Sequence, residues 1–104
     1  LVVKSSGLRQ AFDAQKIKNG SIKSCEKRPV SMSEIDNMVN SVTKQIYNSM
    51  EQEVSSKSIG EMVMEELKNY DEVAYVRYAS VYRSFKDIES FMQELQRLID
   101  NKKL

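Results

Sequence analysis

Lys4 and Lys16 are the residues whose type and spacing point most directly to a chemistry, the binding of a polyphosphate anion. Lys4 ends a short apolar segment expected to form a strand, and Lys16 lies three positions after Asp13, which is expected to cap a helix. A hairpin folded over that helix would bring both amines to the helix N-terminus, where free N–H groups and the helix dipole favour an anion. Arg9, on the returning strand, is a third candidate cation. Because this spacing of two lysines is ordinary, solvated surface lysines remain the alternative at this point.

The residue types that the chain lacks or holds once exclude most enzyme chemistry. With no histidine, the commonest general acid–base group and metal ligand is missing. The single cysteine, Cys25, can close no internal disulfide and cannot build a multi-cysteine zinc site. The segment Ser5-Ser6-Gly7 is not a phosphate-binding loop of the G-x-x-x-x-G-K-[ST] type. Asp/Glu pairs remain possible, but their spacing singles none out, so we predict that the chain is not an enzyme.

Three tyrosines, Tyr75, Tyr78 and Tyr82, follow one another at the spacing i, i+3 and i+7, which places them along one side of a helix. Packing in or beside the core is the usual role of such a stripe. The alternative is stacking on a base, with a hydroxyl group reaching sugar or phosphate. The six methionines are spread along helical stripes and are expected to fill the core.

The 104 residues (12.0 kDa) are the size of one domain, and 40% apolar with 30% charged residues is a globular composition. The net charge of +1 is unevenly distributed: residues 1–30 carry seven Lys/Arg against two Asp/Glu, and residues 31–72 carry three against nine. This asymmetry indicates an anion site near the N-terminus, or else solvated surface faces. Because there is neither an apolar run of ~18–20 residues nor a signal peptide, we expect a soluble cytoplasmic protein without membrane contact.

The pattern of the first half predicts a hairpin followed by two helices. Residues 1–12 have the alternation and turn residues of a β-hairpin. A helix is expected over residues 14–26. Ser31 and Glu34 then form a capping box before a second helix, whose apolar positions keep helical spacing as far as Met50.

The second half predicts a brief extended segment at residues 54–56 and three more helices. The first covers residues 59–70, the second follows Asp71, and the third runs from Asp87 to Ile99. Residues 73–82 are apolar nearly all round, so a buried strand is an alternative, but length and the Asp71 cap favour a helix. Strands first and helices after indicate an α+β domain with a small sheet covering one end of a helical bundle.

Four segments carry a resemblance to a known family: LVVKSSGLRQAFDAQKIKNG, CEKRPVS, VSSKSIGEMVMEEL and DEVAYVRYASVYRSFKDI. They resemble the bacterial transcriptional repressors of ribonucleotide-reductase genes, the NrdR family, from Leu1 to about Leu98. The strings VAYVRYASVYRSFKDI and KRPVS are the most specific parts. The matched region is the ATP-cone, a nucleotide-sensing domain that ribonucleotide reductases also carry. An allosteric ATP-cone of a reductase is therefore the alternative.

The resemblance implies a fold, ligands and partners. It implies an ATP-cone over residues 1–99, with a β-hairpin or three-stranded lid over four to five helices, followed by a polar tail at residues 100–104. ATP and dATP, with Mg²⁺, would be the ligands, and the bound nucleotide would set the state of a homo-oligomer. In such repressors the deoxynucleotide-loaded form is expected to bind operator DNA upstream of reductase genes, in the bacterial cytoplasm.

The resemblance also implies which positions bind the nucleotide. The matching positions lie in the lid, in the first helix, at the start of the third helix and on the tyrosine stripe: Val2, Val3, Lys4, Ser5, Gln10, Lys16, Gly20, Ser56, Tyr78 and Tyr82. Among them, Lys4 and Lys16 match phosphate-binding lysines, and the two tyrosines match residues that line the site. Arg9 is a further candidate for phosphate binding because it is a cation on the returning strand of the hairpin.

Three departures from the family pattern bear on these expectations. The family begins with a four-cysteine zinc ribbon that reads DNA, and because this sequence lacks it, we expect a fragment with zinc only in the absent segment. A common K-[KR]-D-G lid is K-S-S-G here, which predicts lower phosphate affinity unless Arg9 compensates. Lys18 and Ser21 stand at first-helix positions that are often apolar, which predicts looser packing beside the nucleotide.

Overall fold

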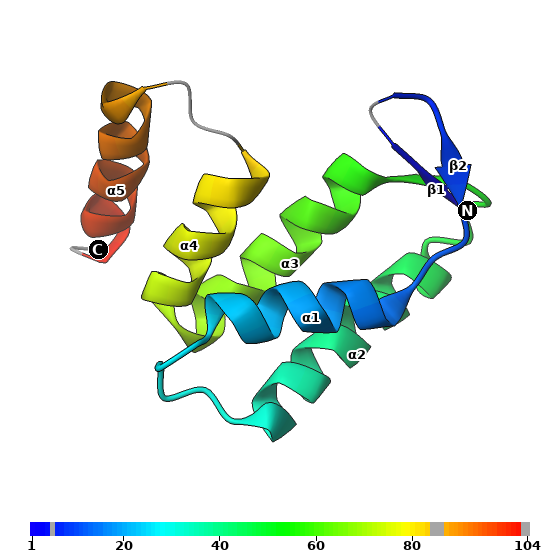
Figure 1. Ribbon diagram of the computed structural model, residues 1–104, viewed down its shortest axis with the longest axis horizontal. Coiled ribbons are helices and arrows are strands. Elements are labelled where there is room, and N and C mark those ends of the chain that lie inside the picture. Colours follow the sequence, from blue (N-terminus) through cyan, green and yellow to red (C-terminus); the bar gives the residue numbers. More distant parts are fainter. Residues whose placement is uncertain (5, 84–86, 103–104) are drawn as a thin grey trace.

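The computed structural model of the chain describes residues 1–4, 6–83 and 87–102. In these residues five helices carry a small sheet at one end (Figure 1). The elements follow one another as β1 Val2–Val3, β2 Arg9–Gln10, α1 Ala14–Ser24, α2 Met32–Asn48, β3 Val54–Ser55, α3 Ser56–Tyr70, α4 Glu72–Tyr82 and α5 Ile88–Lys102. The predicted α+β class, with strands first and helices after, is confirmed.

The sheet has the strand order β2-β1-β3, with β1 antiparallel to β2 and parallel to β3. The hairpin turn is closed by two backbone bonds, from the Lys4 N–H to the Leu8 carbonyl (2.9 Å) and from the Gly7 N–H to the Lys4 carbonyl (2.8 Å). Gly7 has a φ of 86°, a left-handed conformation that glycine adopts without steric cost. The predicted hairpin and the predicted extended segment near residue 54 are thus both present.

Helices α1 to α4 form a closed bundle, in which α1 packs on α2 and α4, and α3 packs on α2 and α4 (Figure 1). Their inward faces bury an apolar core that includes Met38, Val42, Val63, Leu67 and Tyr75. The predicted capping box is complete, since the Ser31 hydroxyl accepts from the Glu34 N–H and the Glu34 carboxylate accepts from the Ser31 N–H.

Several predicted boundaries differ from those observed. Helix α2 ends at Asn48, before Met50, which has a left-handed φ of 56°, and α3 begins at Ser56 rather than at residue 59. Helix α1 ends at Ser24 rather than at residue 26, and Lys27, three residues further on, has a left-handed φ of 60°. The Arg77 guanidinium, from α4, donates to the carbonyls of Ser24 (3.2 Å) and Glu26 (2.7 Å) and so satisfies the helix end. Helix α5 continues past Ile99 to Lys102. Residues 103–104 of the predicted tail lie outside the described residues, and the division of the chain at residue 99 stays a prediction.

Residues 72–82 form helix α4, so the alternative of a buried strand there is wrong. The Asp71 carboxylate caps α4 by accepting from the Ala74 N–H at 2.9 Å. The Arg28 Nε–H donates one bifurcated hydrogen bond to both oxygens of this carboxylate, at 3.1 and 3.0 Å. Arg28 belongs to the KRPVS string, so that string ties the loop between α1 and α2 to the start of α4. No helix in the described part of the chain has the length and apolar character needed to cross a membrane.

Candidate functional site

A cavity of about 290 Å³ lies where the hairpin meets α1, α3 and α4. The sequence-predicted residues that line it come from all of these elements: Val2, Lys4, Gln10, Lys16, Ser56, Tyr78 and Tyr82. The remaining lining residues are Ala11, Phe12, Asp13, Ile17, Ile59 and Gly60. The structure therefore brings both lysines and both tyrosines of the predicted site to one hollow.

The alternation of side chains along a strand decides which hairpin residues reach the cavity. Val2 pairs with Gln10 and Val3 pairs with Arg9 across the two strands. Val2 and Gln10 line the cavity, as does Lys4 two residues after Val2, whereas Val3 and Arg9 do not. Arg9 is instead engaged outside it, with its Nε 2.6 Å from the Glu53 Oε1.

Lys16 lies in the first turn of α1, below the hairpin. Its Nζ is 3.5 Å from the Gln10 Oε1, and the Asp13 carboxylate beside it accepts from the Gln15 N–H at 3.0 Å as the helix cap. Within the described part of the chain, neither Lys4 nor Lys16 forms an ion pair, whereas Arg9 and Lys18 do. Two exposed ammonium groups from separate elements, neither in a described ion pair, are suited to hold a polyphosphate.

The two tyrosines form the wall of the cavity on the α4 side. Their rings are 6.1 Å apart between centroids and inclined by 25°. The Tyr82 hydroxyl donates to the Ser56 carbonyl at 3.3 Å. Burial raises the pKa of both phenols, helped by Tyr82 in the case of Tyr78 and by Glu61 in the case of Tyr82. Both side chains therefore keep their protons at neutral pH and present an aromatic surface with a hydroxyl donor.

Gly60 is one of the six lining residues that were not predicted as site residues. A β-carbon added at this position would overlap the ring and hydroxyl of Tyr82, so only glycine lets that ring lie on α3. The signal available in the sequence was an isolated glycine inside the helical stripe SKSIGEMV, which often marks a close approach. Tyr75, grouped with the other tyrosines by its spacing, is instead fully buried in the core.

The other predicted positions are distributed as follows. Gly20 lines a neighbouring cavity of about 620 Å³, which shares Tyr78 and Tyr82 with the first, and Ser5 lies outside the described residues. Lys18 is partly buried and bonded to Asp36 at 2.9 Å. Ser21 is fully buried and donates to the Ile17 carbonyl at 2.8 Å. The side chains of Lys18 and Ser21 therefore both have partners within the bundle.

The described residues hold no cluster of three Cys, Asp or Glu side chains that could bind a metal ion by themselves. One carboxylate in the cavity, that of Asp13, is already the cap of α1. The described residues thus combine a hairpin, a four-helix bundle and a cavity lined by lysines and tyrosines. Residues 1–88 match the ATP cone domain family, so the chain belongs to this family of nucleotide-sensing domains.

Similar proteins show to which family of ATP-cone proteins the chain belongs. The chain is 56% identical over 102 residues to the transcriptional repressor NrdR of Acetivibrio thermocellus, covering 98% of this chain and 68% of that protein. It is 55% identical to NrdR of Caldicellulosiruptor bescii (98% and 67%) and 56% identical to NrdR of Clostridium acetobutylicum (98% and 68%). The chain therefore belongs to the NrdR family and spans about two thirds of these relatives. They are named as transcriptional repressors and not as enzymes, in agreement with the sequence prediction.

Proposed function

We propose that the cavity under the hairpin is the site at which this member of a transcriptional repressor family senses ATP and dATP. The observation that carries the proposal is the convergence of Lys4 and Lys16, neither in an ion pair within the described residues, on a hollow walled by Tyr78 and Tyr82. The lysines bind the phosphates, while the tyrosines contact the base or sugar. Membership of the ATP cone family supports the same assignment.

The residues outside the cavity have supporting roles in this proposal. Val3 and Arg9 shape the hairpin from its other face, and the Arg9–Glu53 ion pair holds β2 against the segment that leads into β3. Ser56 contributes the N-terminus of α3, and Gly20 lies on the neighbouring cavity beside Tyr78. Ser5 stays a predicted lid residue. Mg²⁺ arrives bound to the phosphate oxygens of the nucleotide, since Mg²⁺ commonly keeps few protein ligands.

The switch itself is a difference in assembly. ATP and dATP compete for the cavity, and the missing 2′-hydroxyl of dATP shifts the preferred homo-oligomer. Linkage requires that the two nucleotides bind the two assemblies with different affinities, because equal affinity shifts nothing. A nucleotide that binds one assembly tenfold more tightly than the other shifts the equilibrium between them by about 1.4 kcal/mol. In the repressor, the dATP-loaded assembly binds operator DNA upstream of ribonucleotide-reductase genes in the bacterial cytoplasm. Zinc belongs to the DNA-reading ribbon of the family and not to this cavity.

Calorimetric titration with ATP and with dATP, with the oligomeric state read by light scattering on the same samples, tests this proposal. Both nucleotides should bind with Mg²⁺ present, and the two loaded forms should differ in molecular mass. A folded chain that binds neither nucleotide contradicts the proposal. Binding of both with one common mass would retain the nucleotide site and remove the switch of assembly.

A further inference from the structure

Helix α5 is attached to the bundle by a limited apolar face and by a set of polar contacts. Of its apolar side chains, Leu98 packs against the buried core, Phe91 and Leu95 are half-buried, and Ile88, Met92 and Ile99 are exposed. A hollow of about 330 Å³ remains between α4 and α5, lined by Val73, Val76, Leu95, Leu98 and neighbouring residues. Figure 1 shows α5 standing beside α4, on the side away from the hairpin. Apolar packing alone therefore leaves this helix weakly held.

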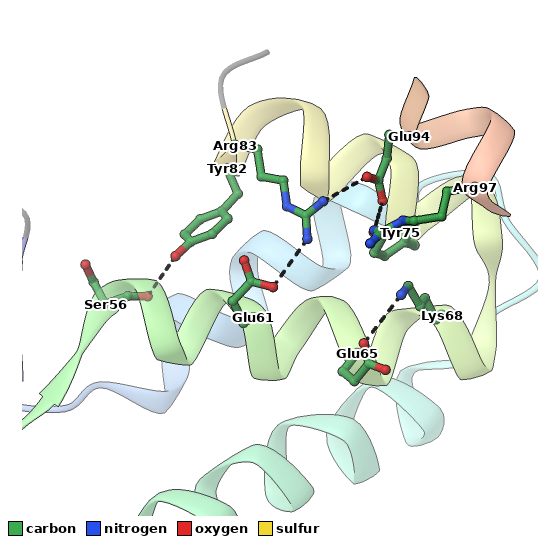
Figure 2. A network of polar contacts seen from close by, with 9 residues as sticks. All are labelled: Ser56, Glu61, Glu65, Lys68, Tyr75, Tyr82, Arg83, Glu94 and Arg97. Atoms are coloured by element: carbon green, nitrogen blue, oxygen red, sulfur yellow. Dashed lines mark hydrogen bonds and ion pairs between the residues drawn. The ribbon is translucent and has the colours of Figure 1, made fainter. Parts of the chain in front are cut away.

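Glu94 is the anchor of α5. Its side chain is 11% exposed, and its carboxylate accepts from Tyr75, Arg97 and Arg83, the last at 3.0 Å between Nη1 and Oε2 (Figure 2). Burial would raise the pKa of this carboxyl group, but the hydrogen bonds from Tyr75 and Arg97 and the charges of Arg97 and Arg83 hold the pKa below its usual range. Tyr75 and Arg83 belong to α4 and its C-cap, so their bonds attach α5 to the bundle, whereas Arg97 lies on α5 and supports the carboxylate from its own helix.

Arg83 joins this anchor to α3. Its Nη2 lies 3.3 Å from the Glu61 Oε2, while its Nη1 holds Glu94, so one guanidinium bridges α3 and α5 (Figure 2). Arg83 is also the C-cap residue of α4, with its N–H donating to the Ala79 carbonyl at 2.8 Å. The position of the last turn of α4 therefore determines where this guanidinium lies.

Two neighbouring contacts join α3 to the end of α4. Gly60 lies against the Tyr82 ring in the cavity. The residues that follow them, Glu61 and Arg83, form an ion pair outside the cavity. The residue that forms this wall of the cavity and the residue that holds Glu94 are therefore neighbours in the backbone.

We propose that α5 is a detachable arm whose docking is coupled to the Tyr82 wall of the cavity, and that Arg83 is the positioning residue that transmits the coupling. A ligand that moves the Tyr82 ring shifts Arg83 and so changes how firmly Glu94 holds α5. The docked and released positions of α5 are the two states that such coupling requires. The use of this arm in sensing rests on the proposed nucleotide function, whereas the mechanical link between cavity and arm does not.

Hydrogen–deuterium exchange of the α5 amides tests the link without any nucleotide. Gly60→Ala forces the Tyr82 ring to move and should speed α5 exchange about tenfold relative to the amides of α2, which report the global stability. Gly20→Ala is the matched control, because its β-carbon would meet Tyr78 only at an ordinary 3.6 Å. Equal α5 exchange in the two variants would overturn the proposal.

A double-mutant cycle assigns the transmission to Arg83. In an Arg83→Gln background, Gly60→Ala should add almost nothing to α5 exchange, because the connection is already cut. In an Arg97→Gln background, which also weakens the Glu94 anchor, the Gly60→Ala effect should persist. Equal effects of Gly60→Ala in both backgrounds would overturn the role of Arg83. If Gly60→Ala does not fold, Tyr82→Phe, which removes the hydroxyl bond to Ser56, replaces it in the cycle with the same outcomes expected.

ATP and dATP added to the wild-type chain separate this inference from the proposed function. Where calorimetry shows binding, α5 exchange should change upon binding, and binding with unchanged α5 exchange would overturn the coupling to ligand. Absence of any binding would contradict the proposed function, while the ligand-free cycle would still decide the link between cavity and arm.

Discussion

The amide oxygen of Gln10 lies 3.5 Å from the Lys16 ammonium group, so the returning strand of the hairpin contacts the first turn of α1 across the cavity. The acceptor on the strand is uncharged, which leaves the charge of Lys16 available to an incoming anion. In the proposed site, the three-stranded sheet of two-residue strands is the lid. The sheet is held by its own turn, by β3 and by this weak polar bond, which a bound phosphate group would replace.

Tyr82→Ala should weaken ATP binding about tenfold or more, because stacking of a base on an aromatic side chain contributes roughly 1–3 kcal/mol. Tyr47→Ala is the matched control, since Tyr47 is 71% exposed on α2 and does not line either cavity beside α4. Calorimetric titration of both variants, with circular dichroism to show that the helices persist, measures the difference. Equal affinities in the two variants would remove Tyr82 from the binding surface.

Asp71→Ala should lower the free energy of unfolding by about 2–3 kcal/mol, because it removes a helix cap and leaves Arg28 without its partly buried partner. Asp71→Asn keeps an acceptor for the Ala74 N–H and should cost less. Urea denaturation followed by circular dichroism compares the two. If Asp71→Asn lost as much stability as Asp71→Ala, the loss would come from the ion pair with Arg28 alone, and the cap would contribute nothing.

The stability of the fold should fall in acid as two carboxylates are protonated. Burial would raise the pKa of Asp71 and of Glu94, but hydrogen bonds and arginine charges reverse this and hold both pKa values below the usual range. A depressed carboxyl pKa contributes stability above the unfolded-state pKa, and this contribution is lost as the pH falls through the folded-state pKa. The unfolding free energy should therefore decrease below about pH 4.

Urea midpoints measured between pH 7 and pH 3 test this dependence. The double variant Asp71→Asn/Glu94→Gln, which has neither carboxylate to protonate, should show a flatter profile over the same range. If the wild-type and double-variant profiles were parallel, other groups would carry the acid sensitivity.

Ser31→Ala should cost about 1 kcal/mol of stability, since it removes the side-chain acceptor of the capping box at the start of α2. Ser33→Ala, two residues further on and exposed within the same helical turn, should change the free energy of unfolding by less than about 0.5 kcal/mol. Thermal unfolding of the two variants in parallel provides the comparison. A larger loss in Ser33→Ala than in Ser31→Ala would contradict the capping assignment.

Local signals in the sequence predicted most of the helix starts and the hairpin. The caps at Asp13, Ser31 and Asp71 are properties of a few neighbouring residues, and each begins a helix where expected. The meeting of Lys4 and Lys16 also followed from local structure, because a hairpin and the helix after it are joined by a short connection.

Features set by distant contacts were not predictable in this way. The Arg9 side chain points away from the cavity because it pairs with Glu53, which follows α2 in the chain. The end of α1 is bonded by Arg77, which belongs to α4. The glycine requirement at position 60 is imposed by Tyr82, a residue of the neighbouring helix. Each of these is a tertiary contact that overrides the local pattern, and none leaves a periodic trace in the sequence.

The proposed nucleotide site depends most directly on Lys4 and Lys16 as the phosphate-binding pair. The measurement that tests it is calorimetric titration of ATP into Lys4→Ala/Lys16→Ala, beside Lys44→Ala/Lys57→Ala, which removes two positive charges from exposed positions outside both cavities. The first variant should fold but no longer bind ATP, while the second should bind it nearly as tightly as the wild type. Retained binding in Lys4→Ala/Lys16→Ala, or an equal loss in both variants, would contradict the proposed site.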